Sequence, residues 1–186
     1  MDAIEQSDDR LRQAMQAVAA GNADAFRAIA EALEPRLERF FAQLGVPEAD
    51  RDDVYQETCL RLYRKADAYN PQRPFLPWAL TVARRVMLNW HRARKSTVAL
   101  EEADNVAADQ RSPGAGAEAD LWMFARTHVS ATGYELLWLR YGEDLDAAEI
   151  AAVTHRTAVH VRVLLHRARA TLAQALEKDG KGRVPK

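Results

Sequence analysis

The helical spacing of the apolar residues is the feature that most limits what this chain can fold into. Apolar residues recur every three or four positions in "DAFRAIAEALEPRLERFFAQLG", "ADRDDVYQETCLRLYRKADAY" and "WALTVARRVMLNWHRARK". The alternating patterns and turn dipeptides typical of strands are missing from the sequence. The spacing therefore predicts an all-α protein. Gly45 is expected to end the first of these helices, and Pro35 to kink or break it.

Residues 96–120 do not follow this helical pattern. They contain no aromatic residue, hold six acidic side chains against the single Arg111, and include the breaker run "SPGAG". We expect a flexible acidic linker here, joining two small helical domains at residues 1–95 and 121–186. The end of the second domain, "KDGKGRVPK", is predicted to be disordered.

Other features of the composition exclude several classes of protein. Cys59 is the only cysteine, so internal disulfides and multi-cysteine metal sites are excluded. The acidic, polar start "MDAIEQSDDR" is unlike a secretory signal, and no apolar run approaches the roughly 20 residues of a membrane span. We expect a cytoplasmic protein without membrane insertion, cofactor or small-molecule substrate. Clustered carboxylates, a phosphate-binding glycine loop and a nucleophile with a nearby base are also missing, which argues against an enzyme.

The charges are strongly segregated, although the formal net charge is only −1. Residues 61–95 hold nine Lys and Arg but one acid, and residues 155–169 hold four Arg, three His and no acid. The first 60 residues hold thirteen acids against six Arg. Two basic segments, each on a patterned helix, favour two contacts with nucleic acid over two merely solvated faces.

The second basic segment has the pattern of a helix-turn-helix. Asp146 is a good N-cap, and Glu149 follows at the capping-box spacing. The short helix that they begin is expected to end near Val153, and Thr157 is expected to cap the next helix. The three histidines of this segment point in different directions, so we predict no metal site.

On the helix after Thr157, apolar side chains form a core face and basic side chains lie away from it. The predicted core residues are Val161, Leu164, Leu165, Ala168 and Leu172. Val159, Val163 and Ala170 lie opposite the core between flanking arginines. In a major groove, arginines reach phosphates or guanine edges, and valine methyl groups touch thymine methyl groups. We predict DNA contacts from eight residues: Thr157, Val159, His160, Arg162, Val163, His166, Arg167 and Arg169.

Two earlier helices also carry distinctive faces. In the helix that begins at Asp53, the core side is predicted to hold Tyr55, Cys59, Leu62, Tyr63 and Ala66. The opposite side places an apolar residue among polar ones, a pattern that indicates protein contact, with Asp53, Gln56, Glu57, Leu60 and Arg64 as its members. The next helix and the loop before it combine basic and aromatic side chains that suit splayed bases. These are Tyr69, Arg73, Phe75, Trp78, Thr81, Arg84, Arg85, Asn89, Arg92 and Lys95. For Tyr69 and Phe75, a role in anchoring the loop to the core is equally compatible with the pattern.

Two stretches resemble a known family. "DDVYQETCLRLYRK…FLPWALTVARRVMLNWHRARK" is similar to region 2 of bacterial sigma factors, and "LLWLRYGEDLDAAEIAAVTHRTAVHVRVLLHRARATL" is similar to their region 4. With only these two regions and a short linker, the chain resembles the extracytoplasmic-function (ECF) group of the sigma-70 family.

The resemblance implies a non-enzymatic subunit that directs RNA polymerase to promoters, for a stress or envelope response. It implies docking of the Asp53 face on the β′ clamp helices of core polymerase and contact with the β flap. It also implies −10 element recognition by the Tyr69–Lys95 set and −35 recognition by the Thr157–Arg169 set. The family commonly has an anti-sigma factor as a partner, and control by the chain's own acidic N-terminal segment or by its expression stays open as the alternative. The alternative is a stand-alone helix-turn-helix regulator of transcription that binds DNA without polymerase.

The chain departs from the family pattern at a few positions. Arg85 stands where the family often has Asn, and His155 where the turn usually has Gly. Val159, Val163 and Leu164 replace small or polar residues of the recognition helix. These departures imply an unchanged fold and a promoter preference different from that of its relatives.

Overall fold

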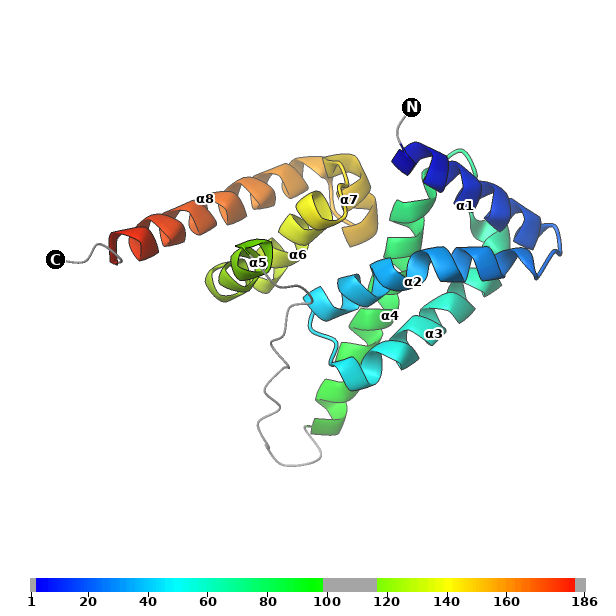
Figure 1. Ribbon diagram of the computed structural model, residues 1–186, viewed down its shortest axis with the longest axis horizontal. Coiled ribbons are helices and arrows are strands. Elements are labelled where there is room, and N and C mark those ends of the chain that lie inside the picture. The colour runs from blue at the N-terminus through cyan, green and yellow to red at the C-terminus, as the bar shows by residue number, and fades with distance from the viewer. Residues whose placement is uncertain (1–2, 99–116, 183–186) are drawn as a thin grey trace. The chain divides into compact units, whose positions relative to one another are not determined.

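The computed structural model describes residues 3–98 and 117–182, and every regular element within these ranges is helical (Figure 1). The chain divides into two compact units, Met1–Asp109 and Gln110–Lys186. Each unit buries an apolar core of its own. The prediction of an all-α chain with two small helical domains is confirmed.

The first unit is a bundle of four helices with a short connecting turn of 3-10 helix. In Figure 1, α4 crosses behind the neighbouring helices α2 and α3, against both of which it packs. The elements are α1 (Ala3–Ala19), α2 (Ala25–Gln43), α3 (Glu48–Arg64), η1 (Ala66–Ala68) and α4 (Phe75–Val98). The core is made by fully buried side chains that recur at helical spacing, among them Ile29, Leu33, Leu37, Leu62 and Leu80.

Pro35 lies inside α2 and does not end it, so of the two predicted alternatives, a kink or a break, the break is excluded. A proline in a helix interior removes one backbone hydrogen bond. However, α2 buries Leu33 on one side of the proline and Leu37 and Phe40 on the other. This burial on both sides holds the helix together, since most of the stability of a helix in a protein comes from tertiary packing.

The helix α1 precedes the segments whose spacing was used to predict helices. It buries Met15 and Val18, and it packs on α2, on η1 and on α4. It therefore lies against the loop that leads into α4, a position that matters for the site described below.

The second unit consists of a sharply bent set of shorter helices packed on one long helix. Its elements are α5 (Ala117–His128), α6 (Ala131–Leu137), the π-helix η2 (Trp138–Gly142), α7 (Ala147–Thr154) and α8 (Ala158–Gly182). The core includes Leu136, Leu139, Ile150, Val153 and Val161, all fully buried.

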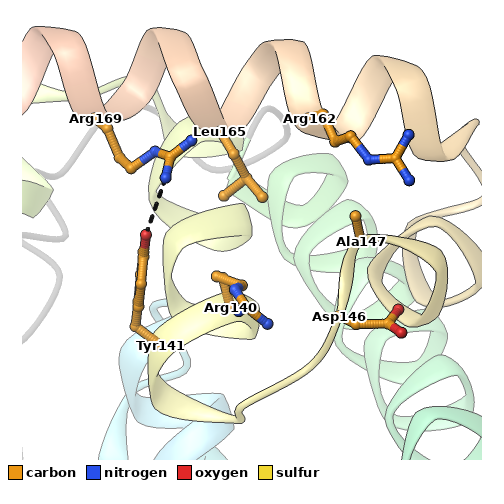
Figure 2. Close-up of a pocket in the computed structure, with 7 residues that line it drawn as sticks. All are labelled: Arg140, Tyr141, Asp146, Ala147, Arg162, Leu165 and Arg169. Atoms are coloured by element: carbon orange, nitrogen blue, oxygen red, sulfur yellow. Dashed lines mark hydrogen bonds between the residues drawn. The ribbon is translucent and has the colours of Figure 1, made fainter.

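The π-helical turn η2 is fixed by Trp138. Its indole Nε1 donates a hydrogen bond to Oε1 of the buried Glu143 at 3.1 Å. The ring lies so close to Gly142 that a Cβ there would be 2.7 Å from the indole Cδ2, which leaves room only for glycine. The turn is thus held in one shape, and it carries Arg140 and Tyr141 toward α8 (Figure 2).

Two predicted boundaries differ from the observed helices. Because α4 continues to Val98 and α5 begins at Ala117, both ends of the predicted linker at 96–120 are helical, and residues 99–116 lie outside the described residues. The predicted disordered tail begins at Lys178, yet α8 runs to Gly182. Residues 183–186 lie outside the described residues.

Candidate nucleic-acid and protein interfaces

The helix-turn-helix of the second unit is built by local capping. Oδ1 of Asp146 accepts hydrogen bonds from the backbone N–H groups of Ala148 and Glu149, at 2.7 and 2.8 Å. Oε2 of Glu149 accepts one from the N–H of Asp146 at 2.8 Å, which completes the predicted capping box.

The turn that follows α7 is also local in origin. The helix ends at Thr154, and His155 adopts the left-handed conformation with φ 54° and ψ 44°. Oγ1 of Thr157 then accepts a hydrogen bond from the N–H of His160 at 3.2 Å, as expected of an N-cap. The predicted turn and both caps are therefore confirmed.

The long helix α8 separates an apolar face from a basic one. Val161, Leu165 and Ala168 are buried, whereas Leu164 and Leu172 are half-buried at the edge of that face. All eight residues predicted to contact the −35 element are exposed, and Val159 and Val163 keep 67% and 44% of their surface in solvent. Two exposed valines between arginines give α8 a surface that can meet both phosphates and base methyl groups.

A pocket of about 260 Å³ lies beside this face (Figure 2). Its lining includes Arg162 and Arg169 of α8 and Arg140 and Tyr141 of η2. The Tyr141 hydroxyl lies 3.5 Å from Nη1 of Arg169, which donates to it, and Nη1 of Arg140 donates to the Leu145 carbonyl at 2.8 Å. Three guanidinium groups face one carboxylate, that of Asp146, so the pocket attracts anions.

The residues of η2 were missed in the sequence. The sequence signal for Arg140 is that it lies shortly before the capping box at Asp146. A basic side chain at this position belongs to the turn that leads into the helix-turn-helix.

On α3, the predicted protein-contact face is on the surface. Asp53, Gln56 and Arg64 are exposed, Leu60 is 41% exposed, and Glu57 is half-buried in an ion pair with Arg61 at 2.6 Å. Among the residues that the structure describes, Leu60 is the large apolar side chain on this polar face.

The predicted core face of α3 is partly wrong. Tyr63 is 43% exposed, and Tyr55 and Cys59 are only half-buried, whereas Val54 and Thr58 are buried beside Leu62. The prediction placed the two tyrosines in the core because their rings are apolar. A tyrosine also carries a hydroxyl group that needs a hydrogen-bond partner, which favours the rim of the core. Tyr55 donates its hydroxyl proton to the Ala30 carbonyl at 2.9 Å. Burial of Thr58 is tolerated because its hydroxyl donates to the Val54 carbonyl at 2.7 Å.

Two of the predicted −10 contacts are buried, which corrects the prediction of base stacking for them. Phe75 is fully buried and Tyr69 is 7% exposed, so neither ring offers a face to a base. The Tyr69 ring packs on Phe75 and on Trp78, with centroid distances of 5.5 and 4.9 Å. Their role in the structure is to anchor the loop, the alternative that the sequence left open.

The hydroxyl of Tyr69 ties down the loop backbone. It donates a hydrogen bond to the Arg73 carbonyl at 2.7 Å. Burial raises the pKa of Tyr69 to about 12, and the nearby Asp8 carboxylate acts in the same direction. The phenol therefore keeps the proton that it donates.

The other predicted −10 residues lie along the surface of α4 and its loop. Arg73, Arg85 and Arg92 are exposed, and Trp78, Thr81, Arg84 and Asn89 are half-buried. Nη1 of Arg92 donates to Oδ1 of Asn89 at 3.0 Å. Lys95 belongs to α4, but its side chain lies outside the described part. The structure thus brings a strip of basic and polar side chains together along α4 and the loop before it.

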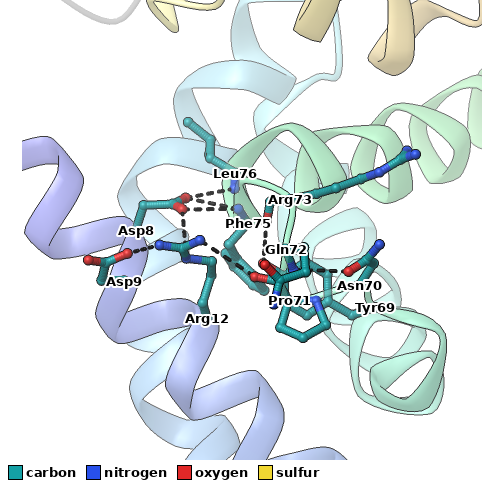
Figure 3. Close-up of polar contacts among 10 residues, drawn as sticks. All are labelled: Asp8, Asp9, Arg12, Tyr69, Asn70, Pro71, Gln72, Arg73, Phe75 and Leu76. Atoms are coloured by element: carbon teal, nitrogen blue, oxygen red, sulfur yellow. Dashed lines mark hydrogen bonds and ion pairs between the residues drawn. The ribbon is translucent and has the colours of Figure 1, made fainter.

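The N-terminus of α4 is capped by a residue that sequence reasoning missed. Oδ1 of Asp8, on α1, accepts hydrogen bonds from the N–H groups of Phe75 at 3.0 Å and Leu76 at 3.1 Å (Figure 3). Arg12 of the same helix forms ion pairs with Asp8 and Asp9. No pattern in the sequence indicates this contact, because Asp8 is 67 residues from Phe75 and 68 residues from Leu76 along the chain.

None of the described helices is both long enough and apolar enough to cross a membrane. Within the same residues, no three His, Cys, Asp or Glu side chains are grouped so that they could hold a metal ion.

Models of known protein families match both units. Sigma-70 region 2 matches residues 29–97, and Sigma-70, region 4 matches residues 135–172. The first match contains α3 and α4 with the loop between them, and the second contains the helix-turn-helix.

Curated relatives align along nearly the whole chain. The ECF RNA polymerase sigma factor SigF of Caulobacter vibrioides is 30% identical over 183 residues, covering 94% of this chain and 98% of that protein. The RNA polymerase sigma factor CnrH of Cupriavidus metallidurans is 28% identical over 174 residues, covering 87% of this chain and 91% of that protein.

Solved structures share the fold. CnrH, solved in complex with the cytosolic domain of CnrY, has a TM-score of 0.67 at 24% identity, covering 91% of this chain and 99% of that chain. The sigma factor RpoE of Bartonella quintana, solved with the anti-sigma factor NepR, has a TM-score of 0.67 at 20% identity, covering 82% and 96%.

Proposed function

This chain belongs to the ECF group of the sigma-70 family of RNA polymerase sigma factors. We therefore propose that three of its exposed surfaces each contact a different partner in promoter-specific transcription initiation: the −35 element, the −10 element and core polymerase. The protein binds core RNA polymerase and promoter DNA, as region 2 and region 4 do in this family. It acts as a non-enzymatic initiation subunit. What remains to be assigned is which of its residues meet which partner.

The observation that carries the proposal is the exposed face of α8. In a helix-turn-helix the second helix lies in the major groove and its side chains meet base edges and phosphates. Here that helix presents Arg162, Val163, His166, Arg167 and Arg169 to solvent while its opposite face is buried. We assign this surface, together with Thr157, Val159 and His160, to the −35 element.

The second surface is the basic strip of α4 with the loop before it. We assign Arg73, Trp78, Thr81, Arg84, Arg85, Asn89, Arg92 and Lys95 to the −10 element. The exposed Arg73 and Arg85 suit the backbone of a separated strand, and the half-buried Trp78 offers an edge to an unstacked base. Tyr69 and Phe75 support this surface from beneath.

The third surface is the polar face of α3 centred on Leu60. An apolar side chain surrounded by polar groups is typical of a small protein-contact site. We assign Asp53, Gln56, Glu57, Leu60 and Arg64 to the β′ clamp helices of core polymerase, and we expect region 4 to meet the β flap. An anti-sigma factor is included among the proposed partners because RpoE of Bartonella quintana was solved with one.

Run-off transcription with purified core polymerase, followed by sequencing of the transcript starts, tests the proposal. We expect start sites that share a −10 and a −35 element and that disappear when the protein is omitted. The alternative of a stand-alone regulator predicts tight duplex binding by the free protein and no association with core polymerase in a pull-down. That pair of results would overturn the proposal.

A further inference from the structure

The helix α4 begins without a cap of its own. The residue before Phe75 is Pro74, which has no side-chain oxygen to accept the first free N–H groups of the helix. Pro77, which directly follows Leu76, has no N–H at all. The N–H groups of Phe75 and Leu76 are therefore the ones that need an acceptor from elsewhere.

Asp8 supplies that acceptor from a different helix. Its carboxylate accepts from the Phe75 N–H with both oxygens, at 3.0 and 3.2 Å, and from the Leu76 N–H at 3.1 Å. Its side chain is 22% exposed, so these bonds are largely shielded from water. A carboxylate is also favoured here by the positive end of the helix dipole.

Arg12 extends the contact from the helix to the loop. Its Nε lies 3.6 Å from Oδ2 of Asp8, and its Nη1 donates to the Pro71 carbonyl at 3.5 Å (Figure 3). One turn of α1 therefore touches both ends of the segment from Pro71 to Leu76.

The loop is further held by its own residues. Oδ1 of Asn70 accepts from the Gln72 N–H at 2.9 Å, and the Arg73 N–H donates to the Asn70 carbonyl at 3.0 Å. With the Tyr69 hydroxyl on the Arg73 carbonyl, the backbone is fixed at several points. The Arg73 side chain extends away from this cluster into solvent (Figure 3).

We propose that Asp8 and Arg12 are positioning residues for capture of the −10 element. They touch no DNA themselves. By fixing the backbone from Pro71 to Leu76, they hold Arg73 and the first turn of α4 in the arrangement that receives an unstacked base. This inference rests on the proposed function of the α4 surface, and it adds a helix that lies before the matched region 2, residues 29–97.

The test measures how tightly the full-length protein, assembled with core polymerase, binds a single-stranded oligonucleotide that carries the non-template −10 sequence of a mapped promoter. Asp8→Ala removes the cap and is expected to weaken binding about fivefold. Asp8→Asn keeps an oxygen that can accept from both N–H groups, and it should lose less. Asp24→Ala is the matched control, because it removes one exposed carboxylate of the same unit that makes no capping hydrogen bond.

A double-mutant cycle distinguishes positioning from general stabilisation. If Asp8 acts through the loop, Arg73→Ala combined with Asp8→Ala should lose little more than the larger single loss. Affinity for core polymerase and for a −35 duplex should stay unchanged. Should Asp8→Ala prevent folding, Arg12→Gln carries the test, since it leaves the cap in place and removes the contact with Pro71.

Unchanged oligonucleotide binding by Asp8→Ala would overturn the inference. So would an equal loss of core affinity, or losses that multiply in the double mutant. Failure of the proposed function is a separate result, seen with the unmutated protein alone: it would give no promoter-dependent transcript with core polymerase.

Discussion

In the proposed contact with the −35 element, two valines on α8 are the residues that we expect to set which promoters this sigma factor prefers. Val159 and Val163 are 67% and 44% exposed, so both side chains are available to a partner. Thymine methyl groups in the major groove are such partners. We therefore expect the −35 elements found by start-site sequencing to place thymines opposite these two positions.

The arginines beside the valines should provide much of the affinity. We expect Arg162→Ala and Arg167→Ala each to weaken binding to a −35 duplex about tenfold, and to lower the slope of log affinity against log salt by about 1 if a phosphate contact is lost. Fluorescence anisotropy at several salt concentrations measures both quantities. Lys178→Ala, also exposed on α8 but beyond the helix-turn-helix, is the control; equal losses there would point to general charge rather than to a specific surface.

His155 is held in a backbone conformation that suits glycine. A residue other than glycine in the left-handed conformation costs about 1–2 kcal/mol. Substitution by glycine removes this strain, but glycine loses more conformational freedom on folding, which offsets part of the gain. We expect His155→Gly to raise the stability of the second unit by about 0.5–1 kcal/mol in thermal unfolding. Ala152→Gly, at an exposed position of α7, should lower it by about 1 kcal/mol, so a matching loss at His155 would contradict the strain.

At the scale of single helices, the sequence predicted best where the structure is local. The capping box at Asp146, the turn at His155 and the two faces of α8 depend on residues within a few positions of one another, and all were confirmed. The core face of α3 was predicted less well, because Tyr63 can pack its ring on Phe26 at 5.5 Å and still stay 43% exposed. Apolar composition alone does not distinguish the rim of a core from its centre.

The polar face of α3 leads to a prediction for core binding. Leu60→Asp places a charge at the centre of the proposed contact with the β′ clamp helices, and we expect affinity for core polymerase to fall about tenfold or more while helicity is kept. Competition with a labelled sigma factor measures the affinity, and circular dichroism measures the helicity. Leu176→Asp is matched in exposure, at 43% against 41%, and should leave core binding intact. Unchanged affinity in Leu60→Asp would remove α3 from the interface.

Across the whole chain, the near-zero net charge conceals surfaces of opposite character. The basic strip of α4 and the basic face of α8 lie in different units, and the exposed polar face of α3 carries the acids Asp53 and Glu57 together with Arg64. The sequence predicted this division because charges cluster along the chain. It could not predict that Asp8 caps α4 or that Arg140 joins Arg162 in one pocket, since these contacts depend on how distant helices pack.

The two cores lead to a prediction about unfolding. Leu37→Ala in the first unit and Ile150→Ala in the second each remove a fully buried side chain, at a cost of about 2–5 kcal/mol. We expect each to lower mainly the transition of its own unit in differential scanning calorimetry. A single transition that shifts equally with both substitutions would mean that the cores unfold together.

The cap that Asp8 provides has a consequence for how such proteins can be recombined. A chimera built by joining residues 29–97, the extent of the matched region 2, to a foreign leader would keep α4 and its loop but lose the acceptor for the Phe75 and Leu76 N–H groups. The segment that has to be transferred is therefore longer than the matched region 2. A functional graft should begin no later than Ala3, the first residue of α1, or should replace Pro74 with a residue that caps α4 from within.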